Sequence, residues 1–296
     1  MAVRKDTIWE RFFSPIVQTF IDQEKVQQLY ESIDWETQSD RFRNPNLIYP
    51  HYYSSQNFQG IEGGYLNPSA AVSYDPITQY LLPPNETWVR QGLIDSIQGI
   101  PRRILDVGCG TGSTTLMLKQ AFPQAQVTGL DLSPYMLVMA DRKANTAGLT
   151  LQWHQGNAEE TGFPDNSFDL VTASLLLHQT PTPATKSILR ECFRLLVPGG
   201  EILILDTNQK TLHPVEWLTE FFEEPYIKDY LAGSVDAWVD AAGFKAVQTK
   251  DLFLVHQVTH GIKPTPAEDT RVRAQQVSTS STIDDFGSEG IPAPAF

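Results

Sequence analysis

Short apolar runs recur through the central part of the chain, and each is followed by turn-forming residues. Runs of about four to eight mostly apolar residues are typical of strands that are buried on both faces of a sheet. The pattern therefore predicts four buried strands. They cover Arg103–Val107, Ala125–Leu130, Phe168–Ala173 and Glu201–Leu205.

Helical periodicity lies between and after these runs. Ser113–Phe122 and Ser187–Leu196 each place their apolar residues on one face, as in an amphipathic helix. We expect Pro198–Gly200 to end the second of these helices and to turn the chain into the next strand. Ser234–Ala242 predicts one more helix, and Lys245–Val258 predicts two closing strands. Strands that alternate with helices indicate right-handed crossovers and a mostly parallel sheet, and therefore an α/β fold.

Three regions of the chain differ in composition. The first 90 residues hold 15 of the 31 aromatic residues, and because aromatic side chains bury large areas, we expect residues 1–90 to form a cap on the core. Residues 91–263 are expected to form that core, with an amphipathic insertion at 212–232. Residues 264–296 are rich in Pro, Ser, Thr and acids, and we expect a disordered or loosely packed tail.

The charge balance limits the classes of partner. The chain has 22 Lys+Arg against 35 Asp+Glu, a formal net charge of −13, which repels nucleic acids and anionic lipid surfaces. Two cysteines are too few for a disulfide framework, and the six histidines show no metal-ligand spacing, so we expect no metal. No apolar run of about 18 residues occurs, which predicts a soluble, cytoplasmic protein without integral membrane association. The sequence does not indicate an oligomeric state.

A glycine-rich turn between a buried strand and a helix is the pattern most specific for chemistry. Gly108, Gly110 and Gly112 follow the first predicted strand, and the helix begins at Ser113. Glycines let the backbone approach a ligand closely, and the free N–H groups at the helix start favour an anion. Nineteen residues beyond Gly112, Asp131 stands at the end of the next strand, where a carboxylate can accept both hydroxyls of a ribose.

Four segments together resemble the class I S-adenosylmethionine-dependent methyltransferases, and within them the small-molecule branch that includes the UbiE-like enzymes. The segments are Leu105–Gly112, Gly129–Ser133, Gly156–Glu159 with Phe163–Asp169, and Arg194–Gly200. They occur in the order that the family uses. The resemblance implies a Rossmann-like fold of seven strands, S-adenosylmethionine as cofactor and S-adenosylhomocysteine as product. A dinucleotide fingerprint has its third glycine where this chain has Ser113.

The resemblance also implies roles for individual residues at the cofactor. Asp106 and the turn from Gly108 to Gly112 would hold the methionine moiety, and Asp131 would bind the ribose. Asn157 and the N–H of Ala158 would contact the edge of the adenine. Asn157 departs from the family, which more often has Asp at this position, although an amide oxygen still accepts from an adenine amino group.

Further cofactor-binding candidates follow from the same resemblance. Leu132 and Met136 would sandwich the adenine ring, and Ser174 directly follows the predicted strand Phe168–Ala173. Tyr74 resembles a tyrosine that closes over the cofactor in this branch, and a core aromatic is an equally good interpretation. Tyr65 follows a glycine pair and is a candidate catalytic residue, because its ring or hydroxyl would stabilise a nearby sulfonium; a core aromatic is again an equally good interpretation.

His178 is the candidate general base. It follows the predicted strand Phe168–Ala173, whose carboxyl end should lie at the edge where ligands bind in open α/β sheets. An imidazole can take a proton from a phenol or an acid near neutral pH, while a purely structural role is the alternative. Holding donor and nucleophile in line contributes about 7–11 kcal/mol, more than a base does, so methyl transfer does not require one.

The acceptor is expected to be a small, apolar or aromatic molecule. Aromatic residues of the first 90, among them Tyr49, Tyr52 and Tyr53, are candidates for a cap over it, or for the core of the cap. An alternative function is a catalytically idle scaffold or sensor that retains the cofactor site. Transfer of an aminopropyl group is a weaker alternative, because residues 172–181 contain no acid for a polyamine.

Overall fold

The structure is a computed structural model that describes residues 22–55, 64–81, 84–213 and 225–266. The chain divides into two units, Met1–Lys263 and Pro264–Phe296. Of the second unit only residues 264–266 are described, so the expected tail falls almost wholly outside the described residues, as does the middle of the expected insertion, residues 214–224.

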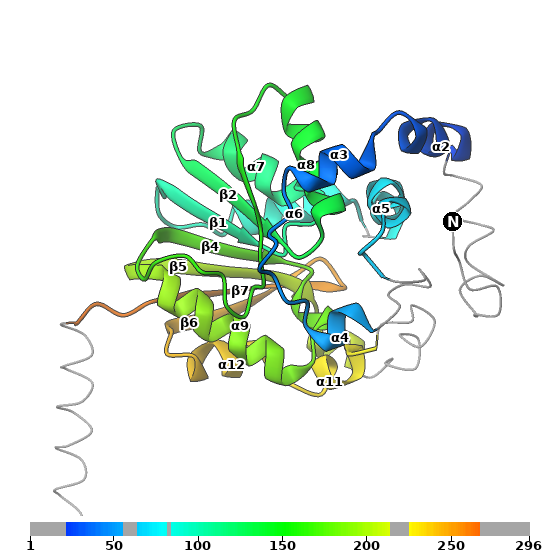
Figure 1. Ribbon diagram of the computed structural model, residues 1–296. Helices are drawn as coiled ribbons and strands as arrows, with labels where there is room; N and C mark the ends of the chain where they lie inside the picture. Colours follow the sequence, from blue (N-terminus) through cyan, green and yellow to red (C-terminus); the bar gives the residue numbers. More distant parts are fainter. Residues whose placement is uncertain (1–21, 56–63, 82–83, 214–224, 267–296) are drawn as a thin grey trace, which may run out of the picture. The chain divides into compact units, whose positions relative to one another are not determined.

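A seven-stranded sheet forms the centre of the first unit (Figure 1). Its strand order is β3-β2-β1-β4-β5-β7-β6. Neighbours from β3 to β5 are parallel, and β7 is antiparallel to both β5 and β6. The strands are β1 (Arg103–Val107), β2 (Gln126–Asp131), β3 (Gln152–Gln155), β4 (Phe168–Ser174), β5 (Leu196–Thr207), β6 (Lys245–Leu252) and β7 (His256–Ile262).

Helices precede the sheet in the chain and connect its strands. The N-terminal helices are α2 (Gln23–Glu31), α3 (Trp35–Asp40), α4 (His51–Ser54), α5 (Pro68–Leu81) and α6 (Glu86–Ile94). The later ones are α7 (Ser113–Ala121), α8 (Pro134–Thr146), the 3₁₀ turn η2 (Leu177–Gln179), α9 (Thr182–Leu195), α10 (Gln209–Leu212), α11 (Ile227–Leu231) and α12 (Val235–Ala241).

Alternate side chains of the central strands pack into two different buried clusters. Leu105 and Ile202 belong to the cluster that includes residues of α9 and α12. Ile104 and Leu203 belong to the cluster that includes residues of α6 and α7. Since successive residues of a strand point to opposite faces, helices cover the sheet on both sides. This double burial explains why the strands appear in the sequence as nearly continuous apolar runs.

The described residues of the N-terminal segment before α6, 22–55 and 64–81, pack on α8 rather than on the sheet. Val26, Tyr65 and Val72 form a buried cluster with Met136 and Met139 of that helix. Figure 1 shows α3 and α5 close to α8, and α2 beyond them. By contrast, α6 covers the sheet together with α7, so the expected cap boundary at residue 90 falls inside a helix that packs in the core.

The predicted Rossmann-like α/β fold with seven strands is confirmed, with local differences. Pro198–Gly200 was expected to end a helix, but α9 ends at Leu195 and these residues lie within β5. The pairing of β5 with β4 shifts there, from Phe168–Leu196 to Leu170–Glu201, so the segment is a bulge. Leu196 is buried and pairs with Phe168 of β4, so the chain enters the sheet directly after α9. The last predicted strand also continues to Ile262.

Candidate functional site

The glycine-rich turn joins the carboxyl end of β1 to α7. Gly108, Gly110 and Gly112 have φ values of 64°, 53° and 78°, a left-handed conformation that residues with a Cβ adopt only at a cost. A Cβ at Gly108 would lie 2.7 Å from a methyl carbon of Leu176, so the backbone at this position lies too close to the Leu176 side chain to carry a side chain of its own. The turn is therefore a preformed backbone surface whose shape depends on glycine.

Asp131 ties this turn to the neighbouring strand. Its carboxylate accepts hydrogen bonds from the N–H groups of Gly110 and Ser133, both at 2.8 Å. The side chain is buried, with the residue 8% exposed, and burial raises its pKa to about 6. The carboxylate thus links the glycine-rich turn to the start of α8. It lies at the carboxyl end of β2, where α/β folds bind ligands.

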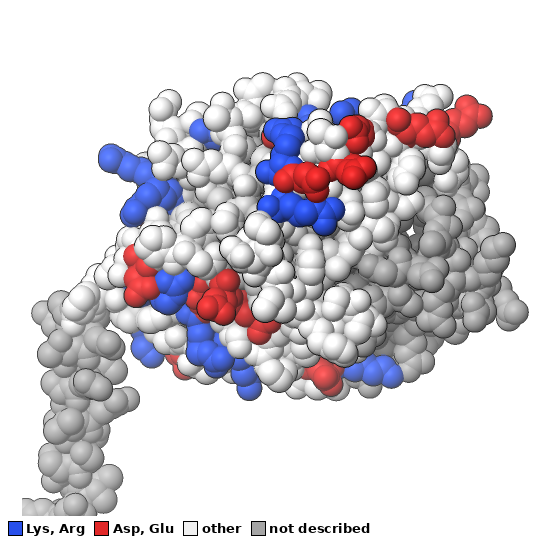
Figure 2. Space-filling view, viewed as in Figure 1, with Lys and Arg blue, Asp and Glu red and all other residues white. Residues whose placement is uncertain are grey.

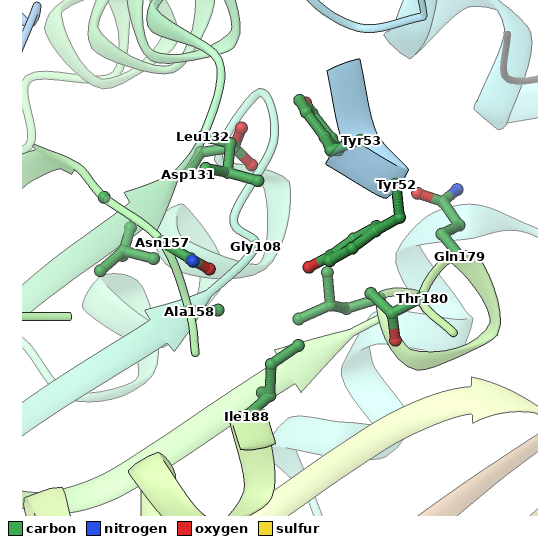
Figure 3. A pocket seen from close by; sticks show the side chains of 13 residues that line it. Tyr52, Tyr53, Gly108, Asp131, Leu132, Asn157, Ala158, Gln179, Thr180 and Ile188 are labelled. Atoms are coloured by element: carbon green, nitrogen blue, oxygen red, sulfur yellow. The ribbon is translucent and has the colours of Figure 1, made fainter. Parts of the chain in front are cut away.

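A pocket opens beside Asp131 (Figure 3). The space between its lining residues, including the part open to solvent, is about 460 Å³. The predicted residues that the structure brings together along its wall are Gly108, Asp131, Leu132, Asn157 and Ala158. The remaining wall is made of Tyr52, Tyr53, Leu130, Gly156, Leu176, Gln179, Thr180 and Ile188. The predicted ribose and adenine positions therefore share one pocket.

Asn157 lies on the same side of this pocket as Asp131, facing the tyrosines of α4 (Figure 3). Its side-chain oxygen accepts the N–H of Glu159 at 3.0 Å, which fixes the orientation of the amide. Met136, by contrast, packs in the buried cluster with the N-terminal segment, and its exposed fraction is 2%. Of the two residues expected to sandwich an adenine, Leu132 therefore lines the pocket and Met136 lies in that cluster.

Helix α4 supplies two tyrosines to the pocket. Figure 3 shows Tyr52 reaching into it, with the hydroxyl directed towards Asn157 and Ala158. That hydroxyl donates a hydrogen bond to Glu159 at 3.1 Å, and burial raises the pKa of Tyr52 well above its ordinary value. Tyr53 is half-buried in the same wall.

Asp106 and Ser174 sit deeper, between β1, β4 and α7. The carboxylate of Asp106 accepts hydrogen bonds from the hydroxyls of Thr115 and Thr172, and burial raises its pKa. Ser174 accepts a hydrogen bond from the hydroxyl of Thr114. Both predicted residues are thus held by threonines beneath the glycine-rich turn.

Tyr65 and Tyr74 pack edge to face, with ring centroids 5.9 Å apart. The Tyr74 ring borders the glycine-rich turn, since a Cβ at Gly110 would lie 3.9 Å from it, and burial raises the pKa of Tyr74 to about 12. The Tyr65 hydroxyl accepts a hydrogen bond from Gln179, whose side chain also lines the pocket. These contacts join the N-terminal segment to the site.

Arg90 is a buried cation that the sequence analysis did not single out. Its guanidinium donates to Glu86 at 2.8 Å and to the Thr114 hydroxyl at 2.6 Å, which in turn donates to Ser174. The Glu86–Arg90 spacing of four residues on one helix is the only sequence signal for it. Hydrogen bonds through Thr114 and Ser174 therefore link the Arg90 guanidinium to the carboxyl end of β4.

His178 lies in η2, directly after β4, and is 5% exposed. Its Nδ1 is 2.5 Å from a carboxylate oxygen of Asp206, at the end of β5. Sequence analysis missed Asp206, although it follows a buried apolar run as Asp131 does. That position at the carboxyl end of a strand is the signal that identifies it.

The described residues contain no group of three or more His, Cys, Asp or Glu side chains placed to hold a metal ion. Within that same part of the chain, no helix is long and apolar enough to cross a membrane. On the face shown in Figure 2, acidic and basic side chains lie close to one another. A second, more open hollow of about 1100 Å³ adjoins the pocket and shares Gly156 and Asn157 with it.

Comparisons with known proteins agree with this geometry. Residues 104–200 match a family model described as a methyltransferase domain. The chain is 37% identical over 119 residues to a demethylmenaquinone methyltransferase of Thermus thermophilus, covering 40% of this chain and 53% of the relative. It is 34% identical over 139 residues to the demethylmenaquinone methyltransferase of Deinococcus radiodurans, covering 47% and 57%. The chain therefore spans about half the length of these curated relatives.

A solved structure shares the fold. It is phosphoethanolamine N-methyltransferase 2 of Haemonchus contortus, with a TM-score of 0.53 and 17% identity, covering 67% of this chain and 58% of that one. The matched family region contains the glycine-rich turn, Asp131, Asn157 and His178.

Proposed function

We propose, from the methyltransferase domain at residues 104–200, that this chain transfers a methyl group from S-adenosylmethionine to a small apolar or aromatic acceptor. S-Adenosylhomocysteine is the product that remains in the site. The reaction is an in-line displacement at the sulfonium methyl group and needs no covalent enzyme intermediate. Its rate depends chiefly on holding donor and acceptor in line.

The hydrogen bond between Asp131 and the Gly110 N–H carries the proposal. It places a buried carboxylate at the rim of a turn whose left-handed backbone favours glycine, within reach of a nucleoside in the adjoining pocket. The ribose hydroxyls donate to Asp131, and the adenine lies along Leu132, Asn157 and Ala158. A sulfonium nucleoside fits these residues better than a dinucleotide does, because the fingerprint glycine is replaced by Ser113.

The methionine end of the cofactor lies over the glycine-rich turn in this proposal. Backbone N–H groups at the start of α7 meet its carboxylate, as anions are bound at helix N-termini. Asp106 and Ser174 line the floor beneath, and Met136 supports the adenine wall from the adjoining cluster. Tyr74 closes over the turn, and Tyr65 stands beside the reacting sulfonium.

The acceptor binds on the side of β4 and β5, next to His178. The curated relatives are demethylmenaquinone methyltransferases, which favours a quinone-like or phenolic acceptor over a nucleic acid. The net charge of −13 supports the same choice. We also propose that the protein is cytoplasmic and that the reaction uses no metal ion.

Calorimetry with S-adenosylhomocysteine tests the cofactor site. Asp131→Ala should weaken binding by about tenfold to somewhat more than a hundredfold, since hydrogen bonds to a charged group contribute about 1.5–3 kcal/mol. Asp169→Ala is a matched control, because Asp169 also accepts two backbone N–H groups but lies at the opposite end of the strands. Its affinity should equal that of the wild type.

A label-transfer assay tests the activity. Incubation with methyl-tritiated S-adenosylmethionine and a small-molecule cell extract should yield a labelled organic-soluble product. Binding of the cofactor without any labelled product would favour an idle binder. Failure of the wild-type protein to bind S-adenosylhomocysteine would refute the proposed function.

A further inference from the structure

Asp75, the residue after Tyr74 in α5, contacts the glycine-rich turn. Its Oδ1 accepts a hydrogen bond from the Thr111 hydroxyl at 2.5 Å. The preceding residue of the turn, Gly110, is the one that borders the Tyr74 ring. Two successive residues of α5 therefore meet two successive residues of the turn, and the hydrogen bond fixes where the Tyr74 ring lies along it.

Lys143 of α8 joins this contact from a third element. Its ammonium group donates to Oδ2 of Asp75 at 2.9 Å. It also donates to the hydroxyls of Ser113 at 2.9 Å and of Thr111 at 3.3 Å. An ammonium group has three donors, so all three have a partner here. We call these side chains the Asp75–Lys143 cluster: Asp75, Thr111, Ser113 and Lys143.

The cluster is largely shielded from water. The side chains of Asp75 and Lys143 are 30% and 27% exposed, and Thr111 is 1% exposed. A buried hydroxyl that loses its hydrogen bonds costs free energy, because water does not replace them. The orientation of Thr111 therefore depends on both charged partners.

The cluster also balances charge at the start of α7. The N-terminus of a helix carries partial positive charge, so a lone ammonium group beside Ser113, the first residue of α7, would be unfavourable. The Asp75 carboxylate neutralises the Lys143 ammonium group. The cluster therefore holds the turn without adding a net charge beside it.

Helix α5 needs an attachment of this kind next to Asp75. Pro76 lies inside the helix, and a proline has no N–H group for the helical hydrogen bond to the carbonyl four residues earlier. The Thr78 hydroxyl donates to the carbonyls of Tyr74 and Asp75, a pattern that bends helices. Contacts outside the helix, rather than the helix alone, therefore set the position of Tyr74.

We infer that Asp75, Thr111 and Lys143 are positioning residues for the amino-acid end of the cofactor and make the site selective for a nucleoside that carries one. The inference rests on the proposed function, in which that end lies over the glycine-rich turn. The cluster keeps the Tyr74 ring and the start of α7 in fixed places, so the amino-acid end meets a preformed surface. A site that is already ordered binds more tightly, because binding does not have to order it.

Two ligands that differ at the amino-acid end test the inference. S-Adenosylhomocysteine carries that end, whereas 5′-methylthioadenosine keeps the nucleoside and the thioether but ends in a methyl group. Calorimetry gives the affinity of each variant for both. Thr111→Val and Lys143→Met should weaken binding of S-adenosylhomocysteine by about threefold to tenfold, as expected for one lost hydrogen bond. Binding of 5′-methylthioadenosine should not change in either variant.

A conservative variant and a matched control accompany these two. Thr111→Ser keeps the hydroxyl and should retain the wild-type affinity for both ligands. Arg41 also ties the N-terminal segment to α8, but its partners Gln38 and Asp141 lie in α3 and α8 rather than in the turn. Arg41→Met should therefore retain both affinities. A loss in Thr111→Ser or in Arg41→Met equal to that in Thr111→Val overturns the inference.

The two charged residues distinguish positioning from a simple charge effect. Asp75→Asn leaves an unbalanced positive charge beside the turn, and Lys143→Met leaves an unbalanced negative one. A positioning role weakens binding of S-adenosylhomocysteine in both variants, whereas a charge effect on either charged group of the ligand changes the two affinities in opposite directions. Opposite changes overturn the inference, and so do equal losses of both ligands.

The same measurements separate this inference from the proposed function. Binding of 5′-methylthioadenosine shows that a variant is folded. Wild-type affinity for S-adenosylhomocysteine in all of the variants overturns this inference alone. Failure of the wild-type protein to bind S-adenosylhomocysteine overturns the proposed function itself.

Discussion

The hydroxyl of Tyr52 donates a hydrogen bond to Glu159, which lies 107 residues later in the chain. This bond joins α4 to the loop after β3 and closes one side of the pocket that both segments border (Figure 3). The carbonyl of Tyr52 is in turn held by the Tyr226 hydroxyl. Through α4, the N-terminal segment therefore borders the pocket as well as packing on α8.

Tyr52→Phe should weaken the attachment of α4 to the loop after β3 while keeping an aromatic ring in the pocket wall. The variant keeps the ring and loses a hydrogen bond to a carboxylate, which contributes about 1 kcal/mol when partly exposed. Amide exchange of residues 51–55, followed by mass spectrometry, should become roughly fivefold faster. Tyr30→Phe, which removes a hydroxyl elsewhere in the N-terminal segment, should leave exchange there unchanged. Unaltered exchange in Tyr52→Phe would show that the bond does not hold α4.

Cofactor affinity should depend on the ionisation of Asp131. Burial raises its pKa to about 6, and ribose hydroxyls donate more strongly to the ionised carboxylate than to the neutral carboxyl group. Binding therefore favours the carboxylate, and affinity should be constant above pH 6. Below pH 6 it should fall by up to about tenfold per unit. Calorimetry with S-adenosylhomocysteine at pH 7.5 and pH 5 measures this, and Asp131→Ala should lack the decrease.

Two glycines of the turn should differ in what an added methyl group costs. Gly110 and Gly112 share a positive φ, which costs alanine about 1–2 kcal/mol at either position. A Cβ at Gly112 would also lie 2.8 Å from the Trp153 ring and 3.0 Å from Ala140, whereas at Gly110 the nearest atom is 3.9 Å away. Overpacking adds about 1–3 kcal/mol. Urea denaturation should show the larger loss for Gly112→Ala, and equal losses would contradict this packing.

The sequence was sufficient to predict the parts of the site that are determined by residues close together in the chain. One strand–turn–helix unit contains Gly108 to Gly112, and its glycines are recognisable because no other residue suits that backbone. Asp131, Asn157 and Ala158 follow strands whose parallel order brings their ends together. A fold-level pattern was therefore sufficient to place them in one pocket.

Contacts between distant segments were not predictable in this way. Nothing in the spacing of Tyr52 and Glu159, or of Arg90 and Thr114, indicates that the side chains meet. Both contacts depend on how the N-terminal helices pack, which short-range periodicity does not specify. Met136 shows the converse, since the expected pocket residue packs with Tyr65 and Val72 in the cluster on α8.

His256 should make the protein less stable in mild acid. The residue is 4% exposed, its Nδ1 is buried and, among the described residues, finds no hydrogen-bond partner, and burial lowers its pKa to about 4. The unfolded chain therefore takes up a proton at a higher pH, near 6.5, than the folded one does. Stability is retained above pH 6.5 and is lost as the pH falls from 6.5 towards 4.

His256→Phe isolates this contribution because it keeps an aromatic ring and removes the titration. Between pH 7 and pH 4.5 the wild type should lose about 2–3 kcal/mol more free energy of unfolding than the variant does. Urea denaturation at both pH values measures the difference, and other titrating groups cancel because both proteins contain them. Parallel losses in the two proteins would mean that the His256 ring gains a proton in the folded state as readily as in the unfolded chain.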